Sequence, residues 1–309
     1  MEEKIGGLII AAGGGKKEEP FRPLKKLGAI TSIKRIVLTF QQVGISPIVV
    51  ITGEQAEEVE WHLAEYGVVF LRNENYEKTE MFDSARIGFE YLKEKCDCVV
   101  FTKLDVPLFT TETLKRIIQK EGLAVSPVYQ GKTGHPISLD KTLIPKILEY
   151  DGRDGMRGFL HSIQSGRVWL NVTDSGIIKS ADELEAEYEL VERHNKQMLH
   201  PYIRLSIEKE RPFFDARAKL LLQLIEDTHS VKGACNRMAL SYSKAWNLLN
   251  EMEQQLGFQV VKRKHGGKSG GRTELSQEGK EFLERYIEFE QNLRLFAEKE
   301  FQRLFPLSI

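Results

Sequence analysis

Short apolar runs alternate with amphipathic stretches as far as Glu192, and no other feature of the sequence constrains the fold as strongly. Five runs have the length and composition of buried strands: Ile5–Ala11, Ile48–Thr52, Val68–Leu71, Val99–Thr102 and Ala124–Val128. Four stretches between them have the apolar spacing of helices: Ser32–Val43, Ala56–Tyr66, Asp83–Glu94 and Thr111–Lys120. Buried strands with helices between them predict βαβ units. We therefore expect a Rossmann-like α/β domain with a mostly parallel sheet that helices cover.

The pattern changes around His200-Pro201, after a charged stretch (181–196) that predicts a solvated helix closing the first domain. The segments that follow predict mainly helices and two short strands: helices over Ala216–Asp227, Val231–Met238, Ser241–Gln255 and Gln277–Leu304, and strands over Phe258–Lys262 and Thr273–Leu275. A chain of 309 residues is long enough for two domains with separate cores. We expect an α/β domain over 1–196 and a mainly α domain over 197–309.

The composition narrows the class of protein. The formal net charge is −1, with 41% hydrophobic and 29% charged residues, so any affinity for nucleic acid has to come from a local patch. No apolar run approaches the ~20 residues of a membrane span, and no charged-then-apolar leader opens the chain. We expect a cytoplasmic protein without a membrane segment. The three cysteines, Cys96, Cys98 and Cys235, are too few for a zinc site of about four ligands.

The stretch from Lys4 to Lys17, KIGGLIIAAGGGKK, predicts a buried strand that runs into a glycine-rich loop. Three successive glycines allow backbone N–H groups to approach phosphate oxygens, and the lysines after them would neutralise charge. The loop has neither the Gly-Lys-Ser/Thr ending of a Walker A motif nor the later glycine of a dinucleotide-binding fingerprint. These residues alone leave a phosphate-binding loop and a plain strand-to-helix turn open. Ligands bind at the carboxyl ends of parallel strands, where this loop and Asp105 would both fall.

The order of motifs after this loop resembles the molybdenum-cofactor nucleotidyltransferases, the MobA/MocA-like group of a family that transfers nucleoside monophosphates to phosphorylated acceptors. The resemblance extends from Ile5 to Glu192 and begins with AAGGGKK, FRPLKKLGAITSIKRIVLTFQQVGI and PIVVITG. The later matches are Asn73, Met81, Ser84, Leu104–Pro107, Gly134–Pro136, Gly152–Gly158 and Asp182. The order and spacing of these motifs are more specific than any one of them.

The resemblance implies roles for individual residues. The nucleotide would be bound by Ala11, Ala12, Gly13, Gly14, Gly15, Lys16 and Ser84. Catalytic roles are implied for Asp105, Lys17 and Arg22, with Mg²⁺ on Asp105 against the α-phosphate and Asp182 as a second carboxylate. His135 would face the acceptor. Each aspartate also has a simpler interpretation as a turn or helix cap, and His135 could merely support its loop.

Three departures from the family leave activity open. Lys17-Glu18-Glu19 replaces the family's Arg-Met-Gly, and two carboxylates beside a triphosphate would repel it unless they turn outward. The family's downstream loop lysine corresponds to Arg22 or is displaced to Lys25 or Lys26, and arginine and lysine differ in geometry. Glu80 replaces a family glycine. A domain that binds nucleotide with weak or no catalysis therefore stays open beside an active enzyme.

The C-terminal part carries a helix-turn-helix pattern followed by a basic segment. Residues at the start of the second helix would reach DNA bases and phosphates: Ser241, Tyr242, Ser243 and Lys244. The basic segment predicts a hairpin wing whose cations would contact phosphates: Lys262, Arg263, Lys264, Lys268 and Arg272. The simpler interpretation of this basic segment is a solvated loop.

Residues Ser241 to Gly279 resemble the DNA-binding domain of ModE-type molybdate-responsive regulators, which are winged helix-turn-helix proteins. The resemblance rests on SYSKAWNLLNEME and on the glycine-rich wing GGKSGG. It implies binding of double-stranded DNA, and a homodimer formed through the helix over Gln277–Leu304. The same helix could instead pack on its own domain. The family's molybdate-binding modules are absent from this chain.

Both resemblances indicate molybdenum metabolism. They imply an enzyme that moves CMP or GMP from CTP or GTP to molybdopterin with Mg²⁺, joined to a DNA-binding regulatory domain. The alternative is a transcription regulator whose degenerate transferase domain only senses nucleotide or cofactor. A third interpretation is a transferase for another phosphorylated acceptor, such as a sugar or polyol phosphate.

Overall fold

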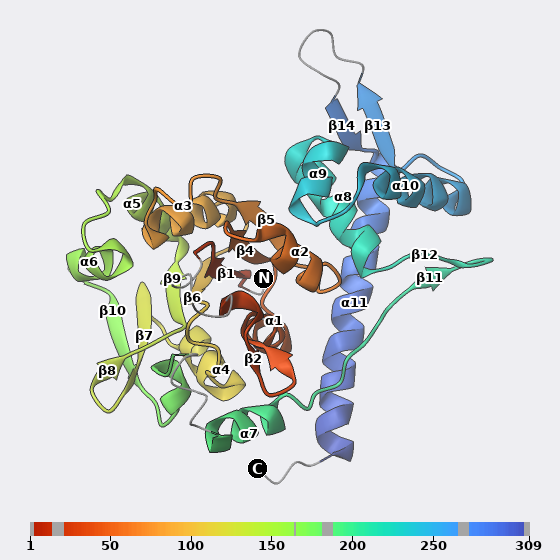
Figure 1. Cartoon of the computed structure of the whole chain (residues 1–309). Coiled ribbons are helices and arrows are strands. Elements are labelled where there is room, and N and C mark those ends of the chain that lie inside the picture. The colour runs from red at the N-terminus through yellow and green to blue at the C-terminus, as the bar shows by residue number, and fades with distance from the viewer. Residues whose placement is uncertain (1–2, 14–21, 164, 181–187, 265–271, 306–309) are drawn as a thin grey trace. The chain divides into compact units, whose positions relative to one another are not determined.

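The computed structural model describes residues 3–13, 22–163, 165–180, 188–264 and 272–305, and the chain divides into two compact units (Figure 1). The units are Met1–Leu199 and His200–Ile309. The sequence predicted a boundary after residue 196, but helix α7 (Tyr188–Gln197) continues past that point.

The first unit is built on an eight-stranded sheet in the order β10-β7-β9-β6-β1-β4-β5, with β8 paired to β7. The strands are β1 (Ile5–Ala11), β4 (Ile48–Thr52), β5 (Val69–Arg72), β6 (Cys98–Lys103), β7 (Ala124–Tyr129), β8 (Lys132–Thr133), β9 (Ile137–Asp140) and β10 (Arg167–Asn171). Strand β1 pairs in parallel with β4 and β6, and β7 with β10, whereas β9 runs antiparallel to β6 and β7. The predicted mostly parallel sheet is confirmed, and the carboxyl ends of its parallel strands share one edge.

Helices cover both faces of this sheet, so its central strands are apolar throughout. The helices of the first unit are α1 (Ser32–Gln42), α2 (Ala56–Leu63), α3 (Met81–Leu92), α4 (Thr111–Gln119), α5 (Ile144–Glu149), α6 (Gly155–Ser162) and α7, with short 3-10 helices η1 (Arg22–Leu24), η2 (Lys141–Leu143) and η3 (Ser175–Ile177) and a small β2–β3 pair (Lys26–Leu27, Ile30–Thr31). Alternate residues of β1 contact opposite layers. Gly7 packs against Phe40 of α1, whereas Leu8 packs against Gly88 of α3.

The contact between Gly88 and Leu8 leaves no room for a side chain. A Cβ at position 88 would lie 2.1 Å from Leu8 Cδ1, and Leu8 is fully buried. We therefore expect Gly88→Ala to lower the free energy of unfolding by about 1–3 kcal/mol, although alanine normally favours a helix over glycine. Urea unfolding measures the change. The control is Glu90→Ala on the same helix, whose side chain is 57% exposed; a Gly88→Ala protein as stable as this control contradicts the prediction.

A buried cation joins three separate parts of the first unit. Arg35 on α1 is fully buried, and its guanidinium donates from Nε to the Leu27 carbonyl oxygen (3.2 Å) and from Nη2 to Asn195 Oδ1 (2.8 Å). Arg35 Nη1 lies 3.2 Å from His194 Nδ1, and His194 Nε2 lies 3.2 Å from the Phe109 carbonyl oxygen. This geometry fits a neutral imidazole that donates from Nε2 and accepts at Nδ1. The cluster fixes α7 and the β2–β3 pair against α1.

His194 makes stability depend on pH. Burial, and then the charge of Arg35, lower the pKa of His194 from 6.5 to about 4. Between those two pH values the unfolded chain binds a proton that the folded chain does not, so stability is complete above pH 6.5 and falls as the pH falls toward 4. The slope from this group is about 1.4 kcal/mol per pH unit. We expect the free energy of unfolding, measured with urea between pH 7 and pH 4.5, to depend less steeply on pH in His194→Gln than in the wild type. An unchanged slope would contradict this assignment.

Within its described residues, the second unit contains four helices and two small antiparallel pairs of strands. They are β11 (Ile207–Glu208), β12 (Pro212–Phe214), α8 (Ala216–Thr228), α9 (Val231–Arg237), α10 (Tyr242–Leu256), β13 (Val261–Lys264), β14 (Arg272–Leu275) and α11 (Gln277–Leu304). The Ser241 hydroxyl accepts from the Lys244 amide (3.4 Å) and caps α10. The long helix over Gln277–Leu304 has the bounds that the sequence predicted. Among the described residues, no helix is both long and apolar enough to cross a membrane.

Candidate functional site

The carboxyl edge of the sheet brings together the ends of β1, β4 and β6. Strand β1 ends at Ala11, Ala12 is buried beside it, and Gly13 is exposed. The Leu104 amide donates to the Ile10 carbonyl oxygen (3.3 Å), which places Asp105, the next residue, beside the end of β1. The sheet therefore juxtaposes the start of the glycine-rich segment and the carboxylate that the sequence singled out.

Several of the predicted site residues fall where the structure gives no description. Gly14, Gly15, Lys16, Lys17 and Asp182 lie outside the described residues. Their predicted contacts with phosphate and metal stay predictions. Arg22 opens the 3-10 helix η1, shortly before the β2–β3 pair.

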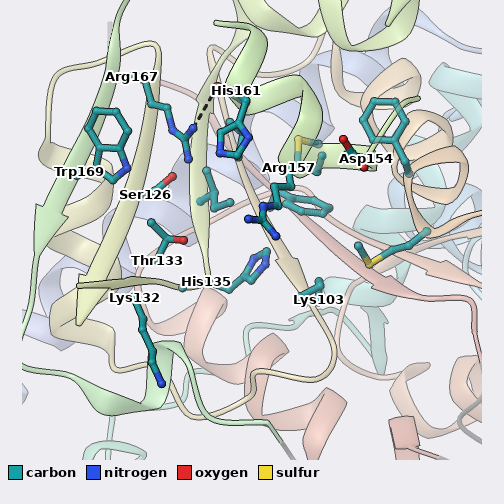
Figure 2. Close-up of a pocket in the computed structure, with 18 of the residues that line it drawn as sticks. Lys103, Ser126, Lys132, Thr133, His135, Asp154, Arg157, His161, Arg167 and Trp169 are labelled. Carbon is teal, nitrogen blue, oxygen red and sulfur yellow. Dashed lines mark hydrogen bonds between the residues drawn. The ribbon is translucent and has the colours of Figure 1, made fainter. Parts of the chain in front are cut away.

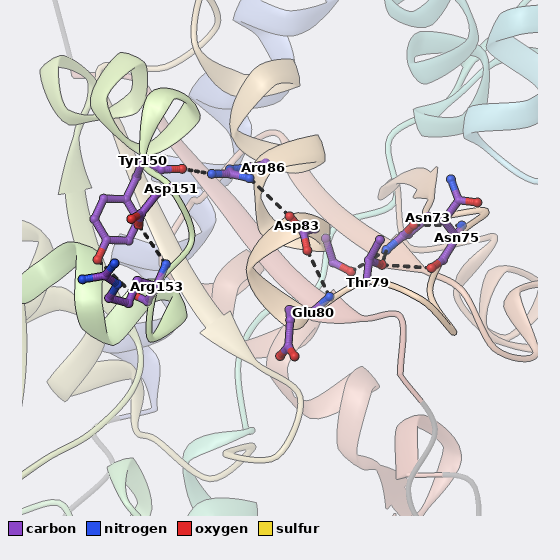
Figure 3. Close-up of polar contacts among 10 residues, drawn as sticks. Asn73, Asn75, Thr79, Glu80, Asp83, Arg86, Tyr150, Asp151 and Arg153 are labelled. Carbon is purple, nitrogen blue, oxygen red and sulfur yellow. Dashed lines mark hydrogen bonds and ion pairs between the residues drawn. The ribbon is translucent and has the colours of Figure 1, made fainter.

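Ser84 belongs to a network that fixes the loop between β5 and α3 (Figure 3). Its side chain is buried, and its hydroxyl accepts a hydrogen bond from Asn73 Nδ2 (2.9 Å), which also donates to Thr79 Oγ1 (2.8 Å). The Asn75 amide donates to Asn73 Oδ1 (3.0 Å). This network positions the loop, and a nucleotide contact by the Ser84 hydroxyl would have to form beside the bond to Asn73.

The start of α3 is tied to the segment after α5. Asp83 accepts from the Glu80 amide (3.0 Å) and pairs with Arg86 (3.2 Å). Arg86 in turn donates to the carbonyl oxygen of Tyr150 (Figure 3). These contacts hold the loop that carries Glu80 next to the loop that leads into α6.

A pocket of about 1020 Å³ includes Lys103, two residues before Asp105, in its lining (Figure 2). Its walls come from the start of α3, from α6, from strands β6 to β10 and from Gly134 and His135. Four cationic side chains line it: Lys103, Lys132, Arg157 and Arg167. The acidic lining residues are Glu80 and Asp154, so the described lining has an excess of positive charge. Such a pocket suits an anionic ligand, and Lys103 brings it within two residues of Asp105.

His135 lies at this pocket, as the predicted acceptor role requires, in a setting that keeps it neutral. Its ring packs edge-on to Phe101, with centroids 5.7 Å apart, and its backbone amide donates to the Ile177 carbonyl oxygen (2.9 Å). Burial, and then the charge of Lys103, lower the pKa of His135 to about 3. At neutral pH the imidazole carries no charge, so it can accept a hydrogen bond from a ligand but cannot neutralise a phosphate.

The residues present fit a divalent cation of the magnesium type. No group of three or more His, Cys, Asp and Glu side chains that could hold a metal ion occurs within the described parts of the chain. Mg²⁺ needs only one or two protein carboxylates when substrate phosphates and waters complete its shell. Asp105 at the sheet edge would supply one carboxylate of this kind.

Sequence reasoning missed most of the pocket. Arg157 and Arg167 come from segments separated by only a few residues, yet α6 and β10 place them on different walls. The run Arg167–Asn171 was not recognised as a strand, because it is polar at both ends and partly exposed. A usable signal was Gly152–Gly158, which belonged to the family resemblance and leads into α6.

The second unit presents a separate candidate surface on α10 and the β13–β14 pair. Tyr242, Ser243 and Lys244 occupy the exposed first turn of α10. The Arg263 guanidinium lies 3.7 Å from the centroid of the Trp246 ring, so β13 is fastened to α10 by a cation–π contact.

The predicted cations of the basic segment differ in their settings. Lys262 is exposed on β13, opposite Glu274 of β14. Arg272 forms an ion pair with Glu274 (2.8 Å) and is therefore partly neutralised. Lys264 ends β13, and Lys268 lies outside the described residues.

Comparison with known proteins identifies a family for most of the first unit. The family model described as "MobA-like NTP transferase domain" matches residues 7–168. The Rv0371c protein of Mycobacterium tuberculosis H37Rv superposes with a TM-score of 0.53 at 21% identity, over 62% of this chain and 99% of that chain. A nucleotidyl transferase from Methanothermobacter thermautotroptrophicus gives a TM-score of 0.52 at 18% identity, over 62% and 98% of the two chains. These superpositions show a shared fold.

Two curated relatives match shorter stretches. "Transcriptional regulator ModE" of Yersinia pestis is 32% identical over 78 residues, which are 25% of this chain and 30% of the relative. "Bifunctional protein GlmU" of Francisella tularensis subsp. novicida (strain U112) is 30% identical over 115 residues, or 36% and 24% of the two chains. This chain therefore spans less than a third of the length of either relative.

Proposed function

Because residues 7–168 make this chain a member of the MobA-like NTP transferase domain family, we propose that its first unit transfers CMP or GMP from CTP or GTP to molybdopterin. An oxygen of the acceptor phosphate forms a bond to the α-phosphorus of the nucleotide. The bond from that phosphorus to the β-phosphate oxygen breaks, and pyrophosphate leaves. The observation that carries this proposal is the position of Asp105, beside the end of β1 and two residues from the cation-rich pocket.

The roles of the residues follow from this placement. The backbone from Ala11 to Lys16 would hold the nucleotide phosphates, with Ser84 on the neighbouring loop. Asp105 and Asp182 would hold Mg²⁺, which when bound neutralises charge around the α-phosphate. Lys17 and Arg22 would add positive charge for the departing pyrophosphate. The acceptor phosphate would enter the pocket, which Lys103, Arg157 and His135 line.

We also propose that the second unit binds double-stranded DNA as a winged helix-turn-helix domain, which would regulate transcription. The ModE match supports this assignment, as does the order of α9, α10 and the β13–β14 pair. In such domains the first turn of the second helix enters the major groove and the wing contacts phosphates. The exposed Lys244 and Lys262 are placed for these two tasks.

A homodimer through α11 is part of the same proposal. Its first half packs on its own unit through Leu283 and Tyr286, which are buried. Its second half exposes apolar side chains, among them Leu295 (61%) and Phe296 (64%). Packing against a second copy would bury these apolar side chains away from water, which favours the dimer. We also propose that the protein is cytoplasmic.

The second candidate function is a regulator that senses nucleotide or cofactor without turnover. Glu80 favours this alternative. It lines the pocket, it replaces a family glycine, and it would add negative charge near the phosphates of the bound substrates. In this alternative the first unit binds a nucleotide and only the DNA affinity of the second unit changes.

One experiment decides between the two. The full chain is incubated with Mg²⁺, molybdopterin and each of the four NTPs in turn, and pyrophosphate release is measured. Release with CTP or GTP supports the transferase and names its nucleotide. Nucleotide binding without release supports the sensor. Release with glucose 1-phosphate or glycerol 3-phosphate, and not with molybdopterin, would replace the proposed acceptor by a sugar or polyol phosphate.

A further inference from the structure

We propose that Trp169 and Ser126 form a recognition face for a planar nitrogen heterocycle, so that the pocket selects an acceptor by its ring system and not by its phosphate alone. This inference rests on the proposed transferase function, because it assigns the ring of the acceptor to the pocket that Lys103 lines. It follows from three observations: an exposed aromatic ring inside a pocket, a register that places a buried hydroxyl beside it, and polar atoms that lack partners.

The first observation is the exposure of Trp169. Its side chain is 55% exposed although it lines the pocket. The Arg167 guanidinium lies 4.9 Å from the centroid of the indole, and Arg167 Nη1 donates to the Leu160 carbonyl oxygen (3.2 Å). The indole is therefore supported by a fixed cation while much of its surface stays open to the pocket. A planar ligand can stack on such a ring.

The second observation is the register of β10 and β7. Trp169 lies directly opposite Ser126 in this parallel pair, so that both side chains project from the same face of the sheet. Figure 2 shows Trp169, Ser126 and Thr133 together along one side of the pocket, with His161 and Arg157 across from them. A ring stacked on Trp169 would present its edge to Ser126.

The third observation concerns hydrogen bonds. Ser126 is 1% exposed, yet its hydroxyl makes no hydrogen bond within the described residues. The same holds for Arg167 Nε and His135 Nδ1. All three atoms belong to side chains that line this one pocket. Buried polar atoms in folded proteins nearly always have partners, so three such atoms around one cavity indicate a polar ligand that supplies them.

The chemistry of these atoms describes the ring. The neutral His135 imidazole has one N–H and one lone-pair nitrogen, so Nδ1 can pair with a donor or an acceptor of the ligand, according to its tautomer. Arg167 Nε is a donor and requires an acceptor, and the Ser126 hydroxyl can serve in either role. A fused heterocycle with adjacent lactam and amino groups, such as a pterin, supplies donors and acceptors along one edge and a flat face for Trp169. The surrounding lysines and arginines suit the phosphate that such an acceptor carries.

The test uses the full chain and pterin-6-carboxylate as the probe. The chain has three tryptophans, so the double variant Trp61→Phe/Trp246→Phe leaves Trp169 as the sole indole. We expect saturable quenching of its emission by the probe. In the wild-type background, isothermal titration should show affinity lowered about tenfold or more by Trp169→Ala, largely kept by Trp169→Phe, and lowered severalfold by Ser126→Ala.

The matched control is Trp61→Ala, because Trp61 is 77% exposed on α2 and does not line the pocket; it should bind the probe as the wild type does. Equal urea midpoints for the variants exclude unfolding as the cause. The inference is overturned if the wild type shows no saturable binding, if Trp169→Ala binds as tightly as the wild type, or if glucose 1-phosphate displaces the probe with higher affinity. Trp169-dependent binding without pyrophosphate release would overturn only the proposed transferase. Pyrophosphate release from the NTP in the presence of molybdopterin, at a rate that Trp169→Ala leaves unchanged, would overturn only the inference.

Discussion

With an NTP and molybdopterin as substrates, Asp105→Asn is expected to reduce the rate of pyrophosphate release by about a thousandfold. The neutral amide keeps the size of the carboxylate but cannot balance the charge of a magnesium ion beside the α-phosphate. The backbone position of the residue, next to the Ile10 carbonyl oxygen, should not change, since the Leu104 amide makes that contact. The measurement is a steady-state assay of pyrophosphate at saturating Mg²⁺ for wild type and variant side by side.

The same strand offers a matched control at its opposite end. Asp97 precedes β6, receives a hydrogen bond from the Lys4 amide (3.1 Å) and pairs with Lys141 (2.5 Å). The Lys141 hydrogen bond is the first cause of the lowered pKa of Asp97. Asp97→Asn therefore removes a carboxylate from the amino edge of the sheet at little cost to stability, because its pair with Lys141 is largely exposed. Its rate should match the wild type. Comparable rates in both variants would remove Asp105 from the catalytic machinery.

The double variant Lys244→Glu/Lys262→Glu is expected to lower affinity for duplex DNA about a hundredfold at ~0.1 M salt. Each lysine that contacts a phosphate releases counterions, so the slope of log K against log salt should fall by about 2 in magnitude. Both side chains are exposed, one on the first turn of α10 and one on β13, and neither lies in the core. Fluorescence anisotropy with a labelled duplex across a salt series gives affinity and slope together.

A control variant with the same change in net charge distinguishes DNA binding through this surface from DNA binding through the overall charge of the chain. Arg204 and Lys209 are exposed in the second unit but lie on none of α10, α11 and the β13–β14 pair. Arg204→Glu/Lys209→Glu should retain nearly the wild-type affinity and slope. If both double variants lose the same affinity, the chain binds DNA only through its overall charge and the winged helix-turn-helix proposal fails.

Much of the fold followed from the sequence because its strands are buried on both faces. Runs such as Ile48–Thr52 need no tertiary information to be recognised, and the long helix over Gln277–Leu304 shows its period over 28 residues. The ends of elements were less predictable. Asp83 was predicted to open a helix, but α3 begins at Met81, because Asp83 accepts from the Glu80 amide as an N-terminal capping residue inside the first turn.

The site was only partly predictable, for a different reason. Asp105 and the first glycines lie at strand ends, where a local pattern suffices to mark them. Ser126 lies within an apolar strand and has the sequence pattern of a core residue, and Trp169 lies in a short, partly exposed strand at the edge of the sheet. They are adjacent because β7 pairs with β10, and the 37 residues of chain between these strands hide that pairing from local sequence patterns.

The buried Arg35 has a consequence for where the first unit can be cut. The family match ends at residue 168, before α7. A fragment trimmed to that match would lose His194 and Asn195 and leave a buried guanidinium with the Leu27 carbonyl oxygen as its remaining partner among those described here. A charge stranded in this way is costly, so the smallest autonomous transferase unit has to extend through Leu199. Helix α7 thus completes the first unit by supplying partners to a buried charge, and a fragment for expression should end after this helix.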